Sequence, residues 1–233
     1  MKDADIEPQK FIRSRGMRFP FDPNIITPKQ RRLLRNGNYE LRELMAVTRM
    51  VKPEDTVLEL GAGLGFMSTV LSTKCKAKEI HAFEANPGLI PYIQDVHREN
   101  SVDNVTLHNA ILGKRKGTVD FYVRGEFPAS SLEDNMGDEG GGIQSVEKVE
   151  VRNVNTTLKE IKPTFLVCDI EGAEADIFTG ANLSCLRGAV IETHPQWIGQ
   201  KGIQAVFDAF QKAGLTFYPK TSNKKVIAFL KDW

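Results

Sequence analysis

VLELGAGLGFMS (57–68) is the stretch that decides the fold. It begins with an apolar run typical of a buried strand, passes through Gly61, Gly63 and Gly65, and continues into a segment that predicts a helix. A strand, then glycines, then a helix places backbone amides and a helix N-terminus beside a ligand. The stretch therefore predicts a nucleotide- or cofactor-binding turn at the first strand of an α/β domain.

The rest of the chain alternates between strand-like and helix-like segments. Buried strands are predicted at 56–60, 79–84, 104–110, 165–170 and 188–194, and helices at 40–50, 66–74, 87–100 and 203–214. Strands separated by helices of this length form right-handed crossovers in a parallel sheet. The alternating segments 118–123 and 145–154 predict an inserted antiparallel pair, and 215–230 predicts a terminal hairpin. We expect a doubly wound, mostly parallel sheet.

Length and composition limit the classes of function. The chain has 233 residues, 41% hydrophobic and 26% charged, with a formal net charge of +1. That length suits one α/β domain, and the near-zero charge supplies no field that would collect nucleic acid or membrane. Three scattered cysteines without a CxxC pair argue against a zinc knuckle or a disulfide framework. Without an apolar segment typical of a signal peptide or membrane span, a cytoplasmic protein is expected.

Residues 1–36 differ from the remainder, 37–233, which we predict to be the catalytic domain. The first segment is basic, with arginines at 13, 15, 18, 31, 32 and 35. Charge runs are usually solvated, so an arm packed on the domain is the favoured interpretation. A lid over the site or a patch for an anionic substrate is the alternative.

The glycine motif narrows the ligand. The dinucleotide fingerprint needs a third glycine where this chain has Phe66, and no phosphate-binding G-K-[ST] follows. The motif E-x-G-x-G-x-G, which begins at Glu59, suits S-adenosylmethionine, because an acid can face its positive charge and glycine amides can bind its carboxylate. Glu84 ends the second strand, where a carboxylate accepts both ribose hydroxyls. The alternatives are a satisfied buried acid for Glu59 and a surface charge for Glu84.

Several segments together resemble the FkbM family of S-adenosylmethionine-dependent methyltransferases. They are ELGAGLG (59–65), FEANP (83–87), NAIL (109–112), ASSL (129–132) and, most specifically, DIEGAE (169–174). The resemblance covers roughly residues 37–220 and implies a Rossmann-like class I methyltransferase fold with a seven-stranded sheet whose last strand is antiparallel. Many members have Asp and Asn where this chain has Glu59 and Gly63, and either acid can serve.

The resemblance implies a cofactor across the carboxyl ends of the strands. The expected cofactor residues are Glu40, Glu59, Gly61, Ala62, Gly63, Gly65, Phe66, Glu84, Ala85, Asn109, Ala110 and Asp169. Asn109 and Ala110 would flank the adenine. Glu40 is equally well interpreted as an acid at a helix start.

Asp169, Glu171 and His194 are the expected catalytic residues. Asp169 ends the fourth parallel strand, with Glu171 two residues on, and His194 ends the next strand, so all three should reach the same rim. A histidine near neutral pKa, or a carboxylate whose pKa is raised by crowding, can remove a hydroxyl proton. Glu192 is expected to orient His194. The alternatives are acids that favour a helix dipole and a structural histidine.

Substrate contacts are expected from Glu174 and from Ser130 and Ser131 of the inserted loop, for which a mobile polar loop is the alternative. Asp169, Glu171 and His194 are suitable ligand types for a divalent ion, but nothing in the spacing demands one and no metal is predicted.

The sequence thus predicts a methyltransferase that uses S-adenosylmethionine, leaves S-adenosylhomocysteine, and methylates a hydroxyl of a small molecule or saccharide. That acceptor class rests on the resemblance. A non-catalytic protein that binds the cofactor, or a methyltransferase for a nitrogen or nucleic-acid acceptor, remains the alternative. No stripe of aromatic and basic residues favours nucleic acid, and no N/D-P-P-Y/F-like segment favours nitrogen.

Overall fold

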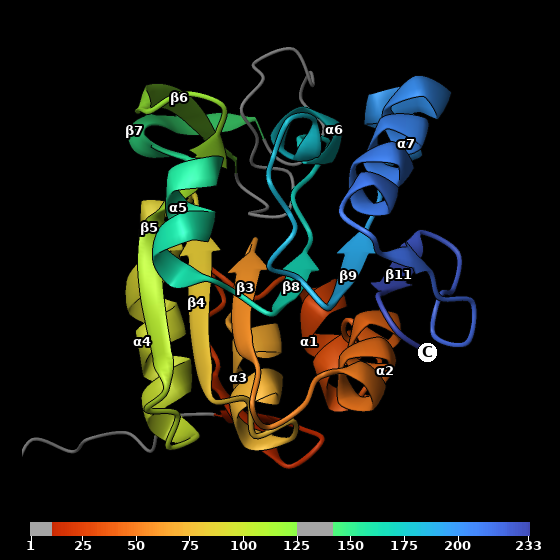
Figure 1. Ribbon diagram of the computed structural model, residues 1–233. Helices are drawn as coiled ribbons and strands as arrows, with labels where there is room; N and C mark the ends of the chain where they lie inside the picture. The colour runs from red at the N-terminus through yellow and green to blue at the C-terminus, as the bar shows by residue number, and fades with distance from the viewer. Residues whose placement is uncertain (1–10, 125–141) are drawn as a thin grey trace, which may run out of the picture.

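The computed structural model describes residues 11–124 and 142–233 (Figure 1). Its strands are β1 (Phe11–Ser14), β2 (Met17–Pro20), β3 (Thr56–Leu60), β4 (Glu79–Glu84), β5 (Val105–Gly113), β6 (Gly117–Arg124), β7 (Ile143–Asn153), β8 (Phe165–Cys168), β9 (Gly188–Glu192), β10 (Thr216–Phe217) and β11 (Val226–Leu230). Its α-helices are α1 (Pro28–Arg35), α2 (Leu41–Met50), α3 (Phe66–Thr73), α4 (Ile90–Glu99), α5 (Val154–Ile161), α6 (Glu174–Phe178) and α7 (Pro195–Lys212), and the 3₁₀ turn η1 (Pro87–Leu89) precedes α4.

The main sheet has the order β10-β11-β9-β8-β3-β4-β5-β7-β6. Strands β5, β4, β3, β8 and β9 are parallel, whereas β11 is antiparallel to β9 and β10 to β11. These are the seven strands that the sequence predicts. The predicted inserted pair is present as β6 and β7, and it extends the same sheet because β7 pairs with β5. The expected fold class is confirmed.

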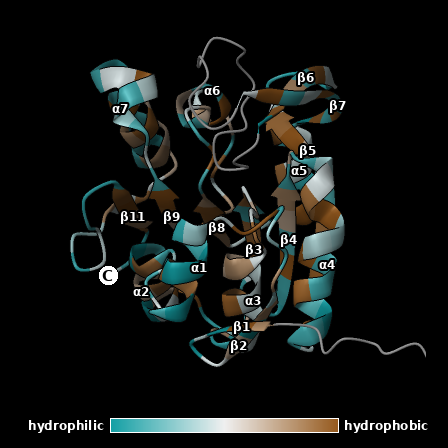
Figure 2. Ribbon diagram, turned by 180° about the vertical axis from the view of Figure 1, so that it is seen from behind, coloured by the Kyte–Doolittle hydropathy of each residue, from teal (hydrophilic) through white to brown (hydrophobic). Residues whose placement is uncertain are grey.

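Helices cover both faces of this sheet (Figures 1 and 2). Successive residues of a strand point to opposite faces, so Val57 of β3 belongs to one core cluster and Leu58 to the other. Helices α1 to α4 contribute Leu34, Val47, Val70 and Val96 to the first cluster, and α5 to α7 contribute Leu158, Phe178 and Phe210 to the second. Figure 2 shows hydrophobic residues concentrated in the strands and hydrophilic ones on the outer sides of α1, α2 and α4.

Residues 11–36 of the basic segment pack against the domain. Strands β1 and β2 form a separate antiparallel hairpin, from which Phe19 stacks on Phe66 of α3 with ring centroids 5.7 Å apart. Tyr92 of α4 donates a hydrogen bond to the carbonyl of Pro20 at 2.8 Å. Helix α1 begins with a capping box in which Thr27 and Gln30 bond each other's backbone amides. The hairpin and α1 thus share the core of the main sheet.

Asp55 joins the amino ends of three strands. Its carboxylate accepts hydrogen bonds from the Arg187 guanidinium just before β9, from Thr164 Oγ1 at 2.7 Å just before β8, and from the Lys52 amide at 2.7 Å. Burial alone would raise the pKa of Asp55, but these hydrogen bonds outweigh it and lower the pKa. Asp55 is therefore a charged anchor at the end of the sheet opposite to the strands' carboxyl ends.

No helix in the described ranges is both long and apolar enough to cross a bilayer.

Candidate active site

A cavity opens at the carboxyl ends of β3, β4, β5 and β8. Its apolar lining includes Phe83, Ile111, Leu112 and Phe121. Carboxylates also line it, those of Glu40, Glu84, Asp169 and Glu171. The strand order places the cavity where ligands bind in open α/β sheets.

The glycine turn gives this cavity its shape. Gly61 has a φ of +85°, and a side chain there would collide with the carbonyl oxygen of Asp169. Its amide and that of Ala62 both donate to the carbonyl of Phe83, and the Gly65 amide donates to Ala62. Because these amides form hydrogen bonds within the fold, they are not free to bind a ligand carboxylate. This differs from the role that the sequence predicts for the glycine amides. The turn instead brings β3 close to the segment after β8.

Glu84 ties the turn to the second strand. One of its carboxylate oxygens accepts from the Gly63 amide and the other from the Asn86 amide, both at 2.8 Å. Burial raises the pKa of Glu84, and these two hydrogen bonds oppose the rise. Each oxygen keeps a further lone pair, and the residue lines the cavity together with Ala85.

Glu59 lies beneath the turn and does not line the main cavity. One oxygen accepts from the Ser68 amide at 3.1 Å in the first turn of α3, and the other is buried without a hydrogen bond. Burial raises the pKa of Glu59 to about 8, against the opposing hydrogen bonds from Ser68. Its position supports α3, with one carboxylate oxygen satisfied and the other not.

Of the other expected cofactor residues, some line the cavity and some support it. Ala110 lines it, as does Glu40, whose pKa is raised well above normal by burial and then by the neighbouring charge of Asp169. Phe66 is fully buried and packs edge-on against Tyr39, so it belongs to the core. Asn109 donates to the carbonyls of Glu84 and Ala85 at 2.9 and 3.0 Å, which fixes the end of β4. Ala62 and Gly65 are not among the lining residues.

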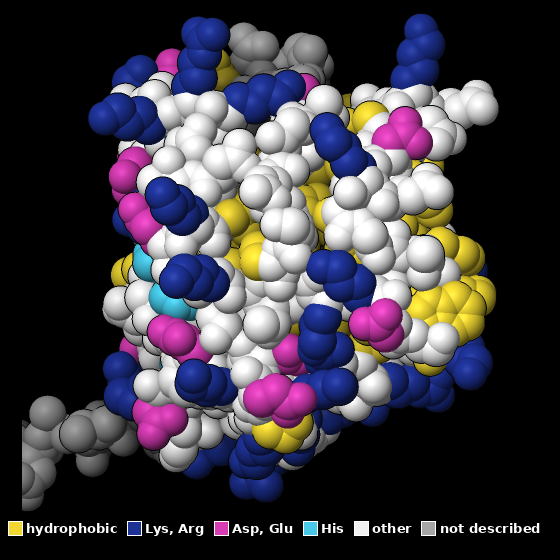
Figure 3. Space-filling view, in the orientation of Figure 1, with side chains coloured by type: hydrophobic (Ala, Val, Ile, Leu, Met, Phe, Trp, Pro, Cys, Tyr) yellow, Lys and Arg dark blue, Asp and Glu magenta, His cyan; other side chains and the backbone are white. Residues whose placement is uncertain are grey.

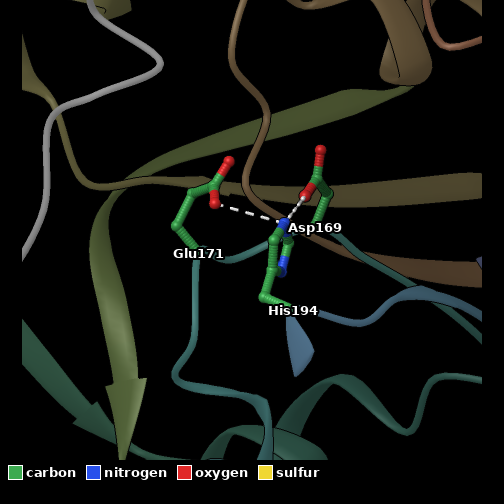
Figure 4. Close-up of side chains that lie close together, drawn as sticks. All are labelled: Asp169, Glu171 and His194. Atoms are coloured by element: carbon green, nitrogen blue, oxygen red, sulfur yellow. Dashed lines mark ion pairs between the residues drawn. The ribbon is translucent and has the colours of Figure 1, made fainter. Parts of the chain in front are cut away.

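Asp169, Glu171 and His194 come together at the rim (Figure 4). His194 Nε2 lies 3.2 Å from Glu171 Oε2 and 3.7 Å from Asp169 Oδ1. On the other side of the ring, Nδ1 lies 2.5 Å from Glu174 Oε1. Glu174 is fully buried, so it holds the imidazole from behind and is not exposed to a substrate, contrary to the expected contact. Glu174 thus orients the His194 ring, the role that the sequence predicts for Glu192.

Burial and neighbouring charges shift the pKa values of the residues in this cluster. Burial and the charges of Glu192 and Glu171 raise the pKa of Asp169 well above normal, and burial also raises the pKa of Glu171. Burial alone would lower the pKa of His194, but the hydrogen bond to Glu174 and the charges of Glu171 and Asp169 outweigh it and raise the pKa. The charges of His194 and Lys225 oppose the rise in the pKa of Glu171 but do not cancel it.

Most of the apolar residues that line the cavity were not predicted from the sequence. Phe121 comes from the inserted strand β6 and is 6% exposed, and Phe83 and Leu112 are also buried. The alternating pattern of 118–123 indicated a strand with one buried face, which was the available signal. Ser130 and Ser131 lie outside the described residues.

Comparison with known proteins gives the family. The family model described as the methyltransferase FkbM domain matches residues 59–233. The chain belongs to the FkbM methyltransferase family. It is thus a methyltransferase of the class that uses S-adenosylmethionine. A comparison of the sequence with curated proteins finds no match.

Two solved structures share the fold of this FkbM-family chain. A precorrin-6y C5,15-methyltransferase from Geobacter metallireducens GS-15 is 15% identical, with a TM-score of 0.50, and the match covers 91% of this chain and 94% of that one. TYW2 from P. horikoshii, solved in complex with MeSAdo, is 12% identical, with a TM-score of 0.51 and coverage of 96% and 72%. At these identities the likeness extends to the fold.

Proposed function

We propose that the protein transfers the methyl group of S-adenosylmethionine to a hydroxyl oxygen of a small molecule or saccharide. The observation that carries the proposal is a cavity whose lining combines apolar residues, a strand-end carboxylate and members of a cluster of acid–base groups. These three parts match a nucleoside base, its ribose and a reacting hydroxyl.

The cofactor is expected to lie with its adenine against Phe83, Leu112 and Phe121. The free lone pairs of Glu84 would accept hydrogen bonds from the ribose hydroxyls. The cationic sulfonium and α-amino groups would lie near Glu40 and Asp169, whose pKa values are raised by burial first and by neighbouring carboxylates next. The MeSAdo in the P. horikoshii TYW2 structure is consistent with a thioether nucleoside in this fold.

Methyl transfer is an in-line displacement at a carbon that the sulfonium already activates. The acceptor hydroxyl loses its proton to the cluster, its oxygen forms a bond to the methyl carbon, and the carbon–sulfur bond breaks with its electron pair left on sulfur. Glu171 is the most exposed member, with a side chain 46% accessible, and is the carboxylate best placed to meet the acceptor. His194, fixed by Glu174, positions Glu171 and shares the proton.

A hydroxyl acceptor is favoured because its oxygen becomes a strong nucleophile only as it loses its proton, and the acid–base cluster can accept that proton. On the face seen in Figure 3, Lys and Arg side chains are spread among neutral and acidic ones, which gives little support to a nucleic-acid acceptor. Cofactor binding without turnover is the alternative that the proposal must exclude.

The test is an acceptor screen with methyl-labelled S-adenosylmethionine. We expect turnover with some hydroxylated small molecules or saccharides and a product whose methyl signal in NMR is that of an O–CH₃ group. Turnover with amines or RNA alone would contradict the hydroxyl acceptor. Cofactor binding with no turnover on any acceptor class would support the non-catalytic alternative.

A further inference from the structure

Nε2 of His194 faces two carboxylates, at 3.7 Å from Oδ1 of Asp169 and 3.2 Å from Oε2 of Glu171. The His194 side chain is 3% exposed. Among the described residues, Oδ1 of Asp169 is buried without a hydrogen bond, although it lies beside this nitrogen. Buried polar atoms normally have partners, so an unpartnered carboxylate oxygen that faces a buried imidazole nitrogen points to a ligand that binds both.

The other ring nitrogen of His194, Nδ1, has the carboxylate partner that is typical of a metal-binding histidine. Glu174, which is fully buried, accepts the Nδ1 proton at 2.5 Å. A histidine that binds a metal through one nitrogen usually donates its other N–H to a carboxylate, which fixes the tautomer and the ring orientation. This contact leaves Nε2 free for an ion and directs it to the point between the two carboxylates (Figure 4).

The spacing of the three ligand atoms suits a small divalent ion. The atoms all lie within 4.8 Å of one another, and Nε2 lies 3.2 and 3.7 Å from the two oxygens. With metal–ligand bonds of about 2.1 Å, neighbouring ligand atoms lie about 3.0–3.4 Å apart. Small side-chain movements would bring all three atoms to bonding distance.

We propose that Asp169, Glu171 and His194 bind one divalent transition-metal ion of the Mn²⁺ or Zn²⁺ type. One imidazole and two carboxylates form a mixed nitrogen and oxygen ligand set that fits these ions better than purely oxygen-preferring ones. The charge also fits, because the carboxylates of Asp169, Glu171 and Glu174 surround an imidazole that is neutral when it binds a metal, and a divalent ion would balance part of their charge.

The ion would face the cavity, which Asp169 and Glu171 line. A hydroxyl bound to it would lose its proton more readily, as water does on Zn²⁺, with the proton passing to solvent past the exposed Glu171. This consequence rests on the proposed function, whereas the ion site itself does not.

The test measures metal binding alone. Full-length protein is treated with a chelator, dialysed and titrated with Mn²⁺, with free Mn²⁺ followed by electron paramagnetic resonance and Zn²⁺ added as a competitor. We expect one site, weakened at least about tenfold in Asp169→Asn, Glu171→Gln and His194→Ala. Glu79→Gln is the matched control, because Glu79 also contacts a histidine, His81 at 3.1 Å, far from the cluster.

Glu174→Gln tests the positioning role, because it removes no ligand. We expect Mn²⁺ affinity to fall by about 10–100-fold. Glu171 is half-exposed, so Glu171→Gln should fold normally, and thermal melting checks this. Absence of saturable Mn²⁺ or Zn²⁺ binding in the wild type, or equal affinity in Glu171→Gln, would overturn the proposal. Neither readout needs methyl transfer, so this failure is distinct from failure of the proposed function.

Discussion

Glu171 lies at the mouth of the cavity with 46% of its side chain exposed, while His194 beside it is 3% exposed. Its carboxylate contributes little to the core, so its replacement should affect chemistry and leave binding of the cofactor product intact. We predict that Glu171→Gln lowers kcat by about 10²-fold or more, the usual range for loss of an acid–base group. Calorimetry should give an affinity for S-adenosylhomocysteine close to that of the wild type.

Asp176→Asn is the control for this variant. Asp176 lies in the following helix α6, its side chain is 90% exposed, and it forms an ion pair with Lys114 at 3.6 Å. Its activity should match the wild type. Full activity in Glu171→Gln would show that Glu171 takes no part in methyl transfer.

At the scale of elements, the turn between β3 and α3 depends on one close approach. Gly61→Ala would place a methyl group against the Asp169 carbonyl at a φ of +85°, so the segment after β8 must move. Gly180→Ala is a matched control, because its φ is +88° but nothing lies within 4 Å of the added carbon. We predict a loss of about 1–2 kcal/mol for Gly180→Ala, from strain alone, and a larger loss for Gly61→Ala.

Urea unfolding of the two glycine variants measures the difference. Binding of S-adenosylhomocysteine should be lost in Gly61→Ala and retained in Gly180→Ala. Equal destabilisation of the two variants would show that the close approach to Asp169 is not what requires glycine at position 61.

At the scale of the whole molecule, the Asp55–Arg187 contact holds the amino ends of β3, β8 and β9 together. Arg187→Met leaves the Asp55 carboxylate, which is 1% exposed, without its cation. Loss of one partner of a buried ion pair costs about 3–5 kcal/mol, and the partial exposure of Arg187 reduces our expectation to about 2–4 kcal/mol. The exposed pair of Arg98 and Asp95 provides the control, since Arg98→Met should cost less than about 1 kcal/mol.

The same contact predicts a dependence on pH. The folded-state pKa of Asp55 is lowered, so its stabilisation is complete above the unfolded pKa of about 4 and is lost as pH falls through the folded value. Urea unfolding at pH 7, 5 and 3 should therefore show the difference between wild type and Arg187→Met shrinking at pH 3. If the difference in the free energy of unfolding stayed constant across this range, the charged Asp55 would not be what the Arg187 guanidinium stabilises.

Much of this architecture could be predicted from local patterns. The carboxyl ends of parallel strands meet at one edge of the sheet, so the sequence predicts that Glu84, Asp169 and His194 lie near one cavity. The pairing of Glu174 with His194 joins residues 20 apart in sequence. It depends on where α6 begins relative to β9, which no local pattern gives.

Two further features depend on tertiary packing. Phe121 reaches the cavity because β7 pairs with β5 and carries β6 with it, and the sequence indicated only that the inserted strands pair with each other. The amides of Gly61 and Gly63 are satisfied by Phe83 and Glu84 of the neighbouring strand, and that of Gly65 by Ala62 within the turn, so the expected ligand donors were already used.

The most direct test of the account is calorimetric titration of the full chain with S-adenosylhomocysteine, in the wild type and in Glu84→Gln. We predict one site per chain in the wild type and affinity weakened by about 10–100-fold in the variant, since hydrogen bonds to a charged group are worth about 1.5–3 kcal/mol. Glu79→Gln, at the exposed start of the same strand, should bind like the wild type. No binding to the wild type, or equal binding in Glu84→Gln, would contradict the cofactor site described above.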